Sequence, residues 1–110
     1  LRMSMVLSGV YVKEKVVFLQ FEISNQGEID YQIDFMKFYL HDLDVVKRMT
    51  YQEIELKPLY EYNHNITEIP KQKTIKKVIA LPLITFPDNK VLSVELYEKQ
   101  GGRHLKIDID

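Results

Sequence analysis

The sequence has no cysteine and only four glycines and four prolines in 110 residues. Without cysteine there is no disulfide, no thiol nucleophile and no thiolate metal ligand, and the redox state of the compartment is left open. A charge excess of one sign is also lacking, because 15 basic residues balance 16 acidic ones. This balance excludes the strongly positive surface that duplex binding uses, so we expect no direct contact with nucleic acid.

Long apolar runs are missing as well. The most hydrophobic stretch, "VIALPLITF" from Val78, is interrupted by Pro82, so the sequence contains no bilayer-spanning segment, and nothing at its start is typical of a signal peptide. A chain of 110 residues is long enough for one core, and we expect one domain over residues 1–110. The opening "LRMSM" indicates a piece cut from a longer protein.

What the sequence does contain is alternation with a period of two. In "VFLQFEISN", Val17 to Asn25, the apolar residues Leu19, Phe21 and Ile23 alternate with polar ones, as in a half-buried strand. A preceding strand that includes "GVYV" would join it through a hairpin that turns near Lys13 to Lys15.

Two longer segments change phase partway along. In Tyr31 to Asp42 the apolar residues before Met36 lie on one face and those after it on the other, which predicts a β-bulge near Met36. The same change of phase occurs between Val45 and Lys57. We expect both strands to bend from one sheet into the other and to shape a contact surface.

Breaks in the pattern divide the rest of the chain. "KPLYEYNHNITEIPK", Lys57 to Lys71, carries two prolines and predicts a long loop with one short strand. Thr74 to Phe86 is a strand interrupted at Pro82, which belongs on an edge or at a bulge. "PDNK", from Pro87, is a turn.

The last two strands are predicted to pair as a hairpin. Val91 to Lys99 and Arg103 to Asp110 each place alternate apolar residues on one face. With Gln100 and Gly101 at the centre of the turn, or with a four-residue loop, the apolar residues meet and Glu95 lies opposite Lys106.

The turn can also be centred one position later, on Gly101 and Gly102. This shift keeps the apolar match but sets Glu95 against Asp108, so charge favours the first register. We interpret Gly101 and Gly102 as structural turn residues with positive φ and not as a phosphate cradle, because no helix follows them.

Candidates for chemistry are few. His41, His64 and His104 do not have the spacing of metal ligands, and we expect each to be solvated at the surface. Asp42 and Asp44 lie close to His41 and suggest a cation site, but aspartate is frequent in turns for backbone reasons. No serine occupies a nucleophile elbow. We therefore expect a non-catalytic protein without a metal or a cofactor.

Two groups of residues suggest a partner surface. The lysines of "KQKTIKK", Lys71 to Lys77, either form a binding patch or protect a strand edge from other chains, and the second is more frequent. Tyr60 and Tyr62 either pin their loop to the core, which we favour, or mark an interface. The candidate interface residues are Tyr60, Tyr62, Lys71 and Lys73.

These patterns predict an all-β fold, an antiparallel β-sandwich or barrel of about seven to nine strands with bulges. Three pieces of sequence carry a resemblance further: "IDFMKFY" from Ile33, "QEIELKPLY" from Gln52 and "YEKQGGRHL" from Tyr97. Together with their order along nearly the whole chain, they resemble the TraN family of conjugative-transposon proteins from Bacteroides-type bacteria.

The resemblance implies a component of a type IV secretion-like apparatus that transfers DNA between cells. It implies that this chain is the C-terminal domain of a longer exported protein in the periplasm or at the outer membrane. Other envelope proteins of the apparatus would be its partners, and the full-length protein would form a homo-oligomeric ring. By fold analogy the sandwich would be immunoglobulin-like or similar to the C-terminal domain of the CagX/TrbG class, which accepts an extended segment of a lipoprotein.

Two alternatives belong to other classes. An extracellular β-sandwich module that binds carbohydrate or protein would use exposed tyrosines such as Tyr60, Tyr62 and Tyr97. An enzyme would need a pocket lined by paired carboxylates or a titratable pair in contact.

Overall fold

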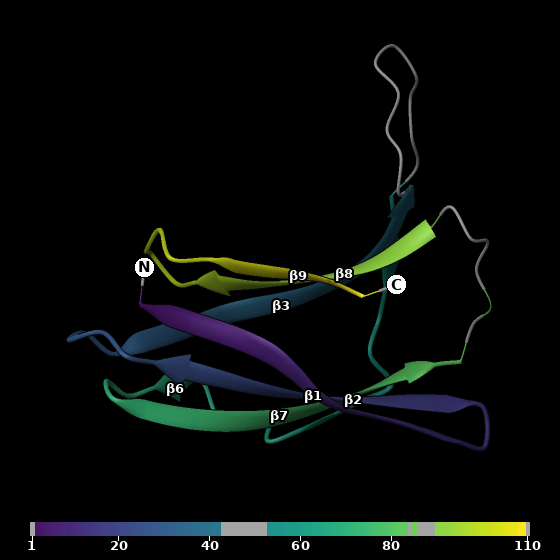
Figure 1. Ribbon diagram of the computed structural model, residues 1–110, viewed down its shortest axis with the longest axis horizontal. Coiled ribbons are helices and arrows are strands. Elements are labelled where there is room, and N and C mark those ends of the chain that lie inside the picture. The colour runs from purple at the N-terminus through teal and green to yellow at the C-terminus, as the bar shows by residue number, and fades with distance from the viewer. Residues whose placement is uncertain (1, 43–52, 84, 86–89, 110) are drawn as a thin grey trace, which may run out of the picture.

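In a computed structural model of the chain, residues 2–42, 53–83, 85 and 90–109 are described and form two stacked antiparallel sheets (Figure 1). These residues contain no helix, and therefore none that is able to cross a membrane. The nine strands in chain order are β1 (Met3–Lys13), β2 (Val16–Asn25), β3 (Tyr31–Asp42), β4 (Ile54–Leu56), β5 (Tyr60–Tyr62), β6 (Glu68–Ile69), β7 (Lys73–Pro82), β8 (Lys90–Glu98) and β9 (Leu105–Ile109).

The predicted all-β sandwich is confirmed. One sheet has the order β1-β2-β7-β5, and the other has the order β4-β3-β8-β9 with β6 also paired to β3. Between β2 and β8 the chain passes repeatedly from one sheet to the other, which ties the two layers together covalently. The buried apolar residues between the layers form one core: Met3, Met5, Leu19, Phe21, Ile23, Tyr31, Phe38, Leu40, Ile69, Ile79, Leu81, Leu92, Val94 and Leu96.

The first hairpin agrees with its prediction. Leu19, Phe21 and Ile23 point into the core and are at most 2% exposed. The chain turns at Glu14 and Lys15, whose φ angles of 50° and 67° are those of a two-residue type I′ turn. This turn has the right-handed twist that the paired strands need.

β3 has the predicted bounds, but its bulge is earlier than expected. The register with β8 shifts between Ile33 and Phe35, and not near Met36. As a result Phe35 points outward and is 49% exposed, while Phe38 is buried. β1 has a second register shift, between Leu7 and Gly9, that the sequence pattern did not indicate.

Two other segments differ from the predictions, and parts of two more fall outside the described residues. The loop from Lys57 to Lys71 contains two short strands, β5 and β6, instead of one. β7 ends at Pro82 and does not continue to Phe86, since Leu83 and Thr85 are outside any strand. Most of the predicted strand from Val45 to Lys57, and residues 87–89 of the predicted turn, fall outside the described residues.

The terminal hairpin has the register that charge favoured. Leu96 lies opposite Leu105, and Glu95 lies opposite Lys106. Apolar side chains of both strands therefore face the same core.

Candidate functional site

β1 changes character at its bulge. The segment Gly9–Lys13, here called the open half of β1, carries Val10, Tyr11 and Val12, which are 53%, 60% and 59% exposed. Within the described part of the chain this segment pairs only with β2, so its other edge has no strand partner. The unpaired N–H and C=O groups of an edge strand can pair with another strand, and large apolar side chains on both faces favour such pairing.

An apolar hollow lies beside the open half of β1, where the two sheets diverge toward the β1–β2 turn (Figure 1). It has a volume of about 150 Å³ and opens to solvent. Every residue that lines it is apolar: Val10, Val17, Leu19, Leu40, Leu56, Leu81, Pro82, Leu92 and Ile109. The described residues therefore leave the core incompletely covered at this end of the sandwich.

On the outer surface of the same sheet, the register aligns one row of residues across all four strands: Tyr11, Phe18, Ala80 and Tyr60. We call this surface, together with Tyr62 on β5, the tyrosine face. Tyr60 and Tyr62 are 60% and 53% exposed, so the prediction that their rings pin the loop to the core is wrong. Backbone pairing with β7 holds β5 in place instead.

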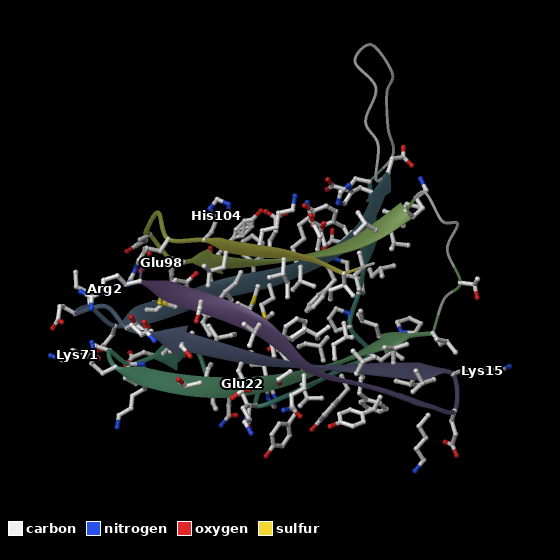
Figure 2. The ribbon with its side chains drawn as sticks, in the orientation of Figure 1. Arg2, Lys15, Glu22, Lys71, Glu98 and His104 are labelled. Atoms are coloured by element: carbon white, nitrogen blue, oxygen red, sulfur yellow. The ribbon has the colours of Figure 1, made fainter. Side chains whose placement is uncertain are left out.

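The four predicted interface residues do not form one surface. Lys71 precedes β7, and its N–H donates to Asp30 Oδ1 at 2.8 Å. Lys73 is the first residue of β7, whereas Tyr60 pairs near the other end of that strand. Figure 2 shows Lys71 at the end of the molecule opposite Lys15, which belongs to the turn beside the open half of β1.

The glycine turn at residues 101 and 102 does not have the predicted conformation. Neither Gly101 nor Gly102 has a positive φ, and the positive value of 54° belongs to Gln100. Glycine at 101 is explained by space, because a Cβ there would overlap the carboxylate of Glu98. A Cβ on Gly102 would meet nothing.

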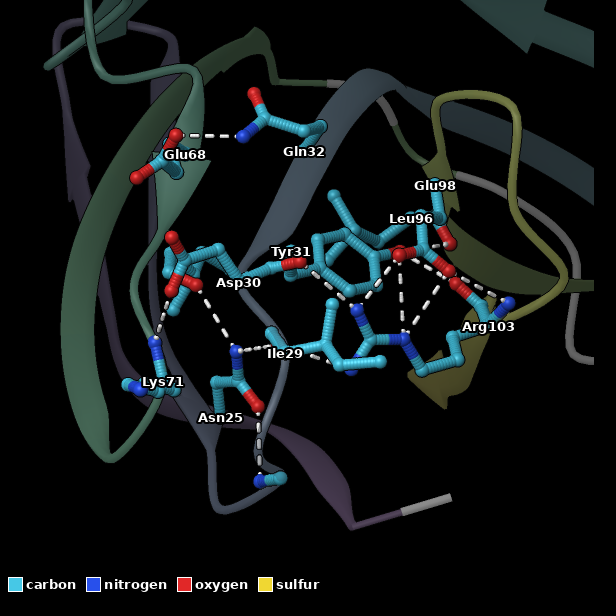
Figure 3. Close-up of polar contacts among 12 residues, drawn as sticks. Asn25, Ile29, Asp30, Tyr31, Gln32, Glu68, Lys71, Leu96, Glu98 and Arg103 are labelled. Carbon is cyan, nitrogen blue, oxygen red and sulfur yellow. Dashed lines mark hydrogen bonds and ion pairs between the residues drawn. The ribbon is translucent and has the colours of Figure 1, made fainter.

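Glu98 and Arg103 close this turn (Figure 3). Arg103 donates to Glu98 from its backbone N–H at 3.0 Å and from Nη2 at 2.7 Å, and these bonds hold the pKa of the Glu98 carboxyl below its ordinary value. Arg103 Nη2 also donates to the carbonyl of Asp30. Tyr31 donates to the Arg103 carbonyl at 2.7 Å, and burial raises the pKa of Tyr31 to about 12. Protein oxygens occupy these donors, which is a structural role and not that of a phosphate site.

His41 is not solvated as predicted. Its side chain is 16% exposed, and its Nε2 lies 2.6 Å from Ser93 Oγ, which donates to Asp108 Oδ1 at 2.5 Å. The residue types are those of a catalytic triad, but the order is different. Ser93 lies between the histidine and the carboxylate, and it is completely buried. A nucleophilic serine must instead face its substrate, with the histidine between it and the carboxylate.

The cation site suggested by His41, Asp42 and Asp44 gains no support. Asp42 accepts a bond from Lys90 Nζ at 2.5 Å, so its charge already has a partner. Asp44 lies outside the described residues. Within the ranges that are described, no group of three histidine, aspartate or glutamate side chains is placed to hold a metal.

An aromatic row on the outer face of the second sheet was not predicted. Phe35 and Tyr97 lie opposite each other with ring centroids 4.5 Å apart, and Tyr97 stacks on His104 at 5.2 Å. β3 and β9 flank β8, so Phe35 and His104 reach the Tyr97 ring from different neighbours of its strand. Tyr97 is half-buried and therefore offers less ring surface to a sugar than Tyr60 or Tyr62 does.

Sequence reasoning also missed the buried lysine of the "KQKTIKK" cluster. Lys77 is 2% exposed, and its Nζ lies 2.8 Å from Glu61 Oε1. It does not protect a strand edge. The signal was available, because Lys77 is in phase with Ile75, Ile79 and Leu81, which point inward.

Comparisons with known proteins give one result. Neither the search of curated proteins nor the search of solved structures returned a match, so the likeness to immunoglobulin-like or CagX/TrbG domains stays a prediction. The family described as "Domain of unknown function (DUF4138)" matches residues 1–110, and the chain belongs to that family.

Proposed function

We propose that this domain is a non-catalytic interaction module of a conjugative DNA-transfer apparatus that binds an extended segment of another envelope protein. The segment would add as a strand to the open half of β1. The observation that carries the proposal is the exposure of Val10, Tyr11 and Val12 on a strand edge that no other described strand covers.

An added strand would use both faces of this edge. Its side chains alternate, so one set would enter the apolar hollow beside Val10, and the other would lie on the tyrosine face beside Tyr11. Backbone hydrogen bonds would supply affinity, and the two surfaces would select the side chains. A partner with alternate apolar and aromatic residues fits this arrangement.

The gain from burial is large enough to matter. Burying a fully exposed large apolar side chain contributes roughly 1.5 to 3 kcal/mol, and about half of this remains to be gained at each of Val10, Tyr11 and Val12, which are 53%, 60% and 59% exposed. Association and the ordering of an extended segment offset much of this gain. A specific complex of moderate affinity is the expected result.

The process and the location come from the resemblance to TraN proteins. That resemblance supports a place in the periplasm or at the outer membrane, with other transfer proteins as partners. A ring of the full-length protein is part of the same proposal, and the mass of the purified full-length protein tests it.

The test is a titration of isotope-labelled domain with each purified envelope component of the transfer apparatus. We expect one component to shift the amide signals of residues 9–13. Two exposed valines of β1 give a matched pair of variants, because Val10 is in the open half and Val6, 52% exposed, is not. Val10→Lys should abolish the shifts and Val6→Lys should retain them.

Shifts confined to another surface, or none with any component, would contradict the proposal. A second candidate, a carbohydrate-binding module, is favoured only by the exposure of Tyr11, Tyr60 and Tyr62 on one face. Binding to a single sugar class on a glycan array, lost in Tyr60→Ala, would select that alternative.

A further inference from the structure

A second opening lies on the other side of the sandwich, independent of the open half of β1. β6 covers β3 at Tyr31 and Gln32, and β4 covers it from Phe38 onward. Between these points the chain leaves for the other sheet as β5, so Asp34–Lys37 has no described strand on that side.

A pocket of about 300 Å³ is located at this gap. Its lining mixes apolar and polar groups, and it differs in this from the apolar hollow beside Val10. The residues that line it are Ile33, Asp34, Phe35, Met36, Phe38, Pro58, Glu61, His64, Ile66, Thr67 and Lys77.

The pocket contains the ion pair of Lys77 and Glu61, whose side chains are 2% and 36% exposed. Lys77 Nζ donates to Glu61 Oε1 at 2.8 Å and to the carbonyl of Asn63 at 3.1 Å. Such a pair stabilises the fold only weakly, because desolvation of the buried lysine offsets much of the attraction and apolar residues of similar volume often serve as well. A pair that faces a cavity has a more direct explanation, since it presents charge to a ligand.

The balance of charge in the lining indicates the sign of that ligand. One lysine is present with two carboxylates, Asp34 and Glu61. Lys77 uses two of its three donors on protein oxygens, whereas Glu61 uses only Oε1 and Asp34 has no partner among the described contacts. Among the charged groups of the lining, the carboxylate oxygens without a described partner outnumber the remaining ammonium donor, and the carboxylate charge exceeds that of the lysine. His64 and Thr67 are the other lining residues with polar side chains.

We infer that this pocket binds an alkylguanidinium group, such as the side chain of arginine. A guanidinium offers a planar fork of donors that matches carboxylate oxygens, in this case Asp34 and the second oxygen of Glu61. The aliphatic part would lie on the apolar lining formed by Ile33, Met36 and Ile66. The source is either free arginine or an arginine in a segment that runs along the gap in β3.

The experiment is a titration of the isotope-labelled domain with N-acetyl-arginine-N-methylamide. The matched control ligand is the citrulline derivative, which has the same shape without the charge. We expect the arginine compound to shift the signals of residues 34–37, 61 and 77. The citrulline compound should bind about tenfold more weakly, as for the loss of one charge-assisted hydrogen bond.

Two variants separate binding from folding. Asp34→Asn removes an exposed carboxylate that has no described partner, and it should weaken arginine binding about tenfold while the fold is retained. The double variant Glu61→Leu with Lys77→Met replaces the ion pair by apolar groups, and it should fold but bind no arginine. Glu22→Gln, on the outer face of the other sheet, is the control variant and should bind as the parent protein does (Figure 2).

The inference is overturned if the arginine compound causes no shifts, if the citrulline compound binds equally, or if N-acetyl-glutamate-N-methylamide binds better than both. Unchanged arginine binding in the double variant would overturn it as well. An extended six-residue peptide with a central arginine distinguishes the two sources. Tighter binding than free arginine indicates a protein segment, and equal binding indicates the free compound.

Discussion

The two ends of the sandwich differ: at one end a buried polar side chain has all its hydrogen bonds, and at the other an apolar side chain remains exposed. At the end where the β2–β3 turn meets β6, Asn25 is 1% exposed and fully bonded, with its Nδ2 donating to the carbonyls of Ile29 and Ile69 and its Oδ1 accepting from Gly27. At the other end Val10 lies open beside an apolar hollow. What is incomplete in this domain is therefore apolar burial, because no buried side-chain nitrogen or oxygen in the described residues lacks a partner.

The largest expected difference concerns aliphatic truncation at the two ends. Ile23→Ala, on β2 close to Asn25, should lower the free energy of unfolding by about 2 to 5 kcal/mol, because it leaves a cavity where Ile23 is completely buried. Val10→Ala should change it by less than about 0.5 kcal/mol. Urea unfolding of both variants measures the difference. Equal losses would show that the open half is packed in solution.

Asn25 tests the polar side of the comparison. Asn25→Ala should cost about 2 to 3 kcal/mol, since three backbone groups lose their partner and two of these bonds are buried. Gln20→Ala on the same strand removes only an exposed bond to Ser8 and should cost less than about 0.5 kcal/mol. Thermal unfolding ranks the two variants. A larger loss for Gln20→Ala than for Asn25→Ala would contradict the account of the hydrogen-bonded end at Asn25.

The Glu98–Arg103 pair adds a dependence on pH. Arg103 lowers the pKa of Glu98 in the folded state, so the stabilisation is present above the unfolded-state pKa and is lost as pH falls through the folded-state value. Glu98→Gln should therefore cost about 1 to 2 kcal/mol at neutral pH, and this cost should shrink below about pH 4. Urea titrations at several pH values measure it. A cost that is constant from neutral to acid pH would rule out the ionised pair as its origin.

The smallest expected effect distinguishes the two adjacent glycines. Gly101→Ala should cost about 1 kcal/mol, because the new methyl group displaces the Glu98 carboxylate from Arg103. Gly102→Ala faces open space and should be neutral or slightly stabilising. Equal melting temperatures for the two variants would show that Glu98 adjusts without loss.

The alternation of apolar and polar residues made some strands predictable and left the details of others undetermined. The strand from Val17 to Asn25 and the hairpin register at Glu95 and Lys106 follow from local periodicity and charge, and both are confirmed. The bulge of β3 was detected as a change of phase, but its position depends on how β8 pairs with β3. Phe35 therefore lies outside the core, although its residue type favours burial.

The candidate sites also combine features that the sequence predicted with features that depend on strand order. The exposure of Tyr60 and Tyr62 was one of two predicted alternatives, but their alignment with Tyr11 follows from strand order, which no local pattern encodes. The charge cluster around Lys71 predicted a surface role for every lysine in it. Lys77 is buried because its strand lies inside a sheet and Glu61, distant in sequence, is close in space.

By itself the sequence determined the all-β class, the single core and the pairing within the first and last hairpins, because a period of two decides which face each residue takes. Only the tertiary structure decided which edges stay open and which charges meet. The physical reason is that an open edge, or an ion pair around a buried lysine, is a property of strands brought together from distant parts of the chain. The apolar hollow beside Val10 and the pocket at Lys77 both arise in this way.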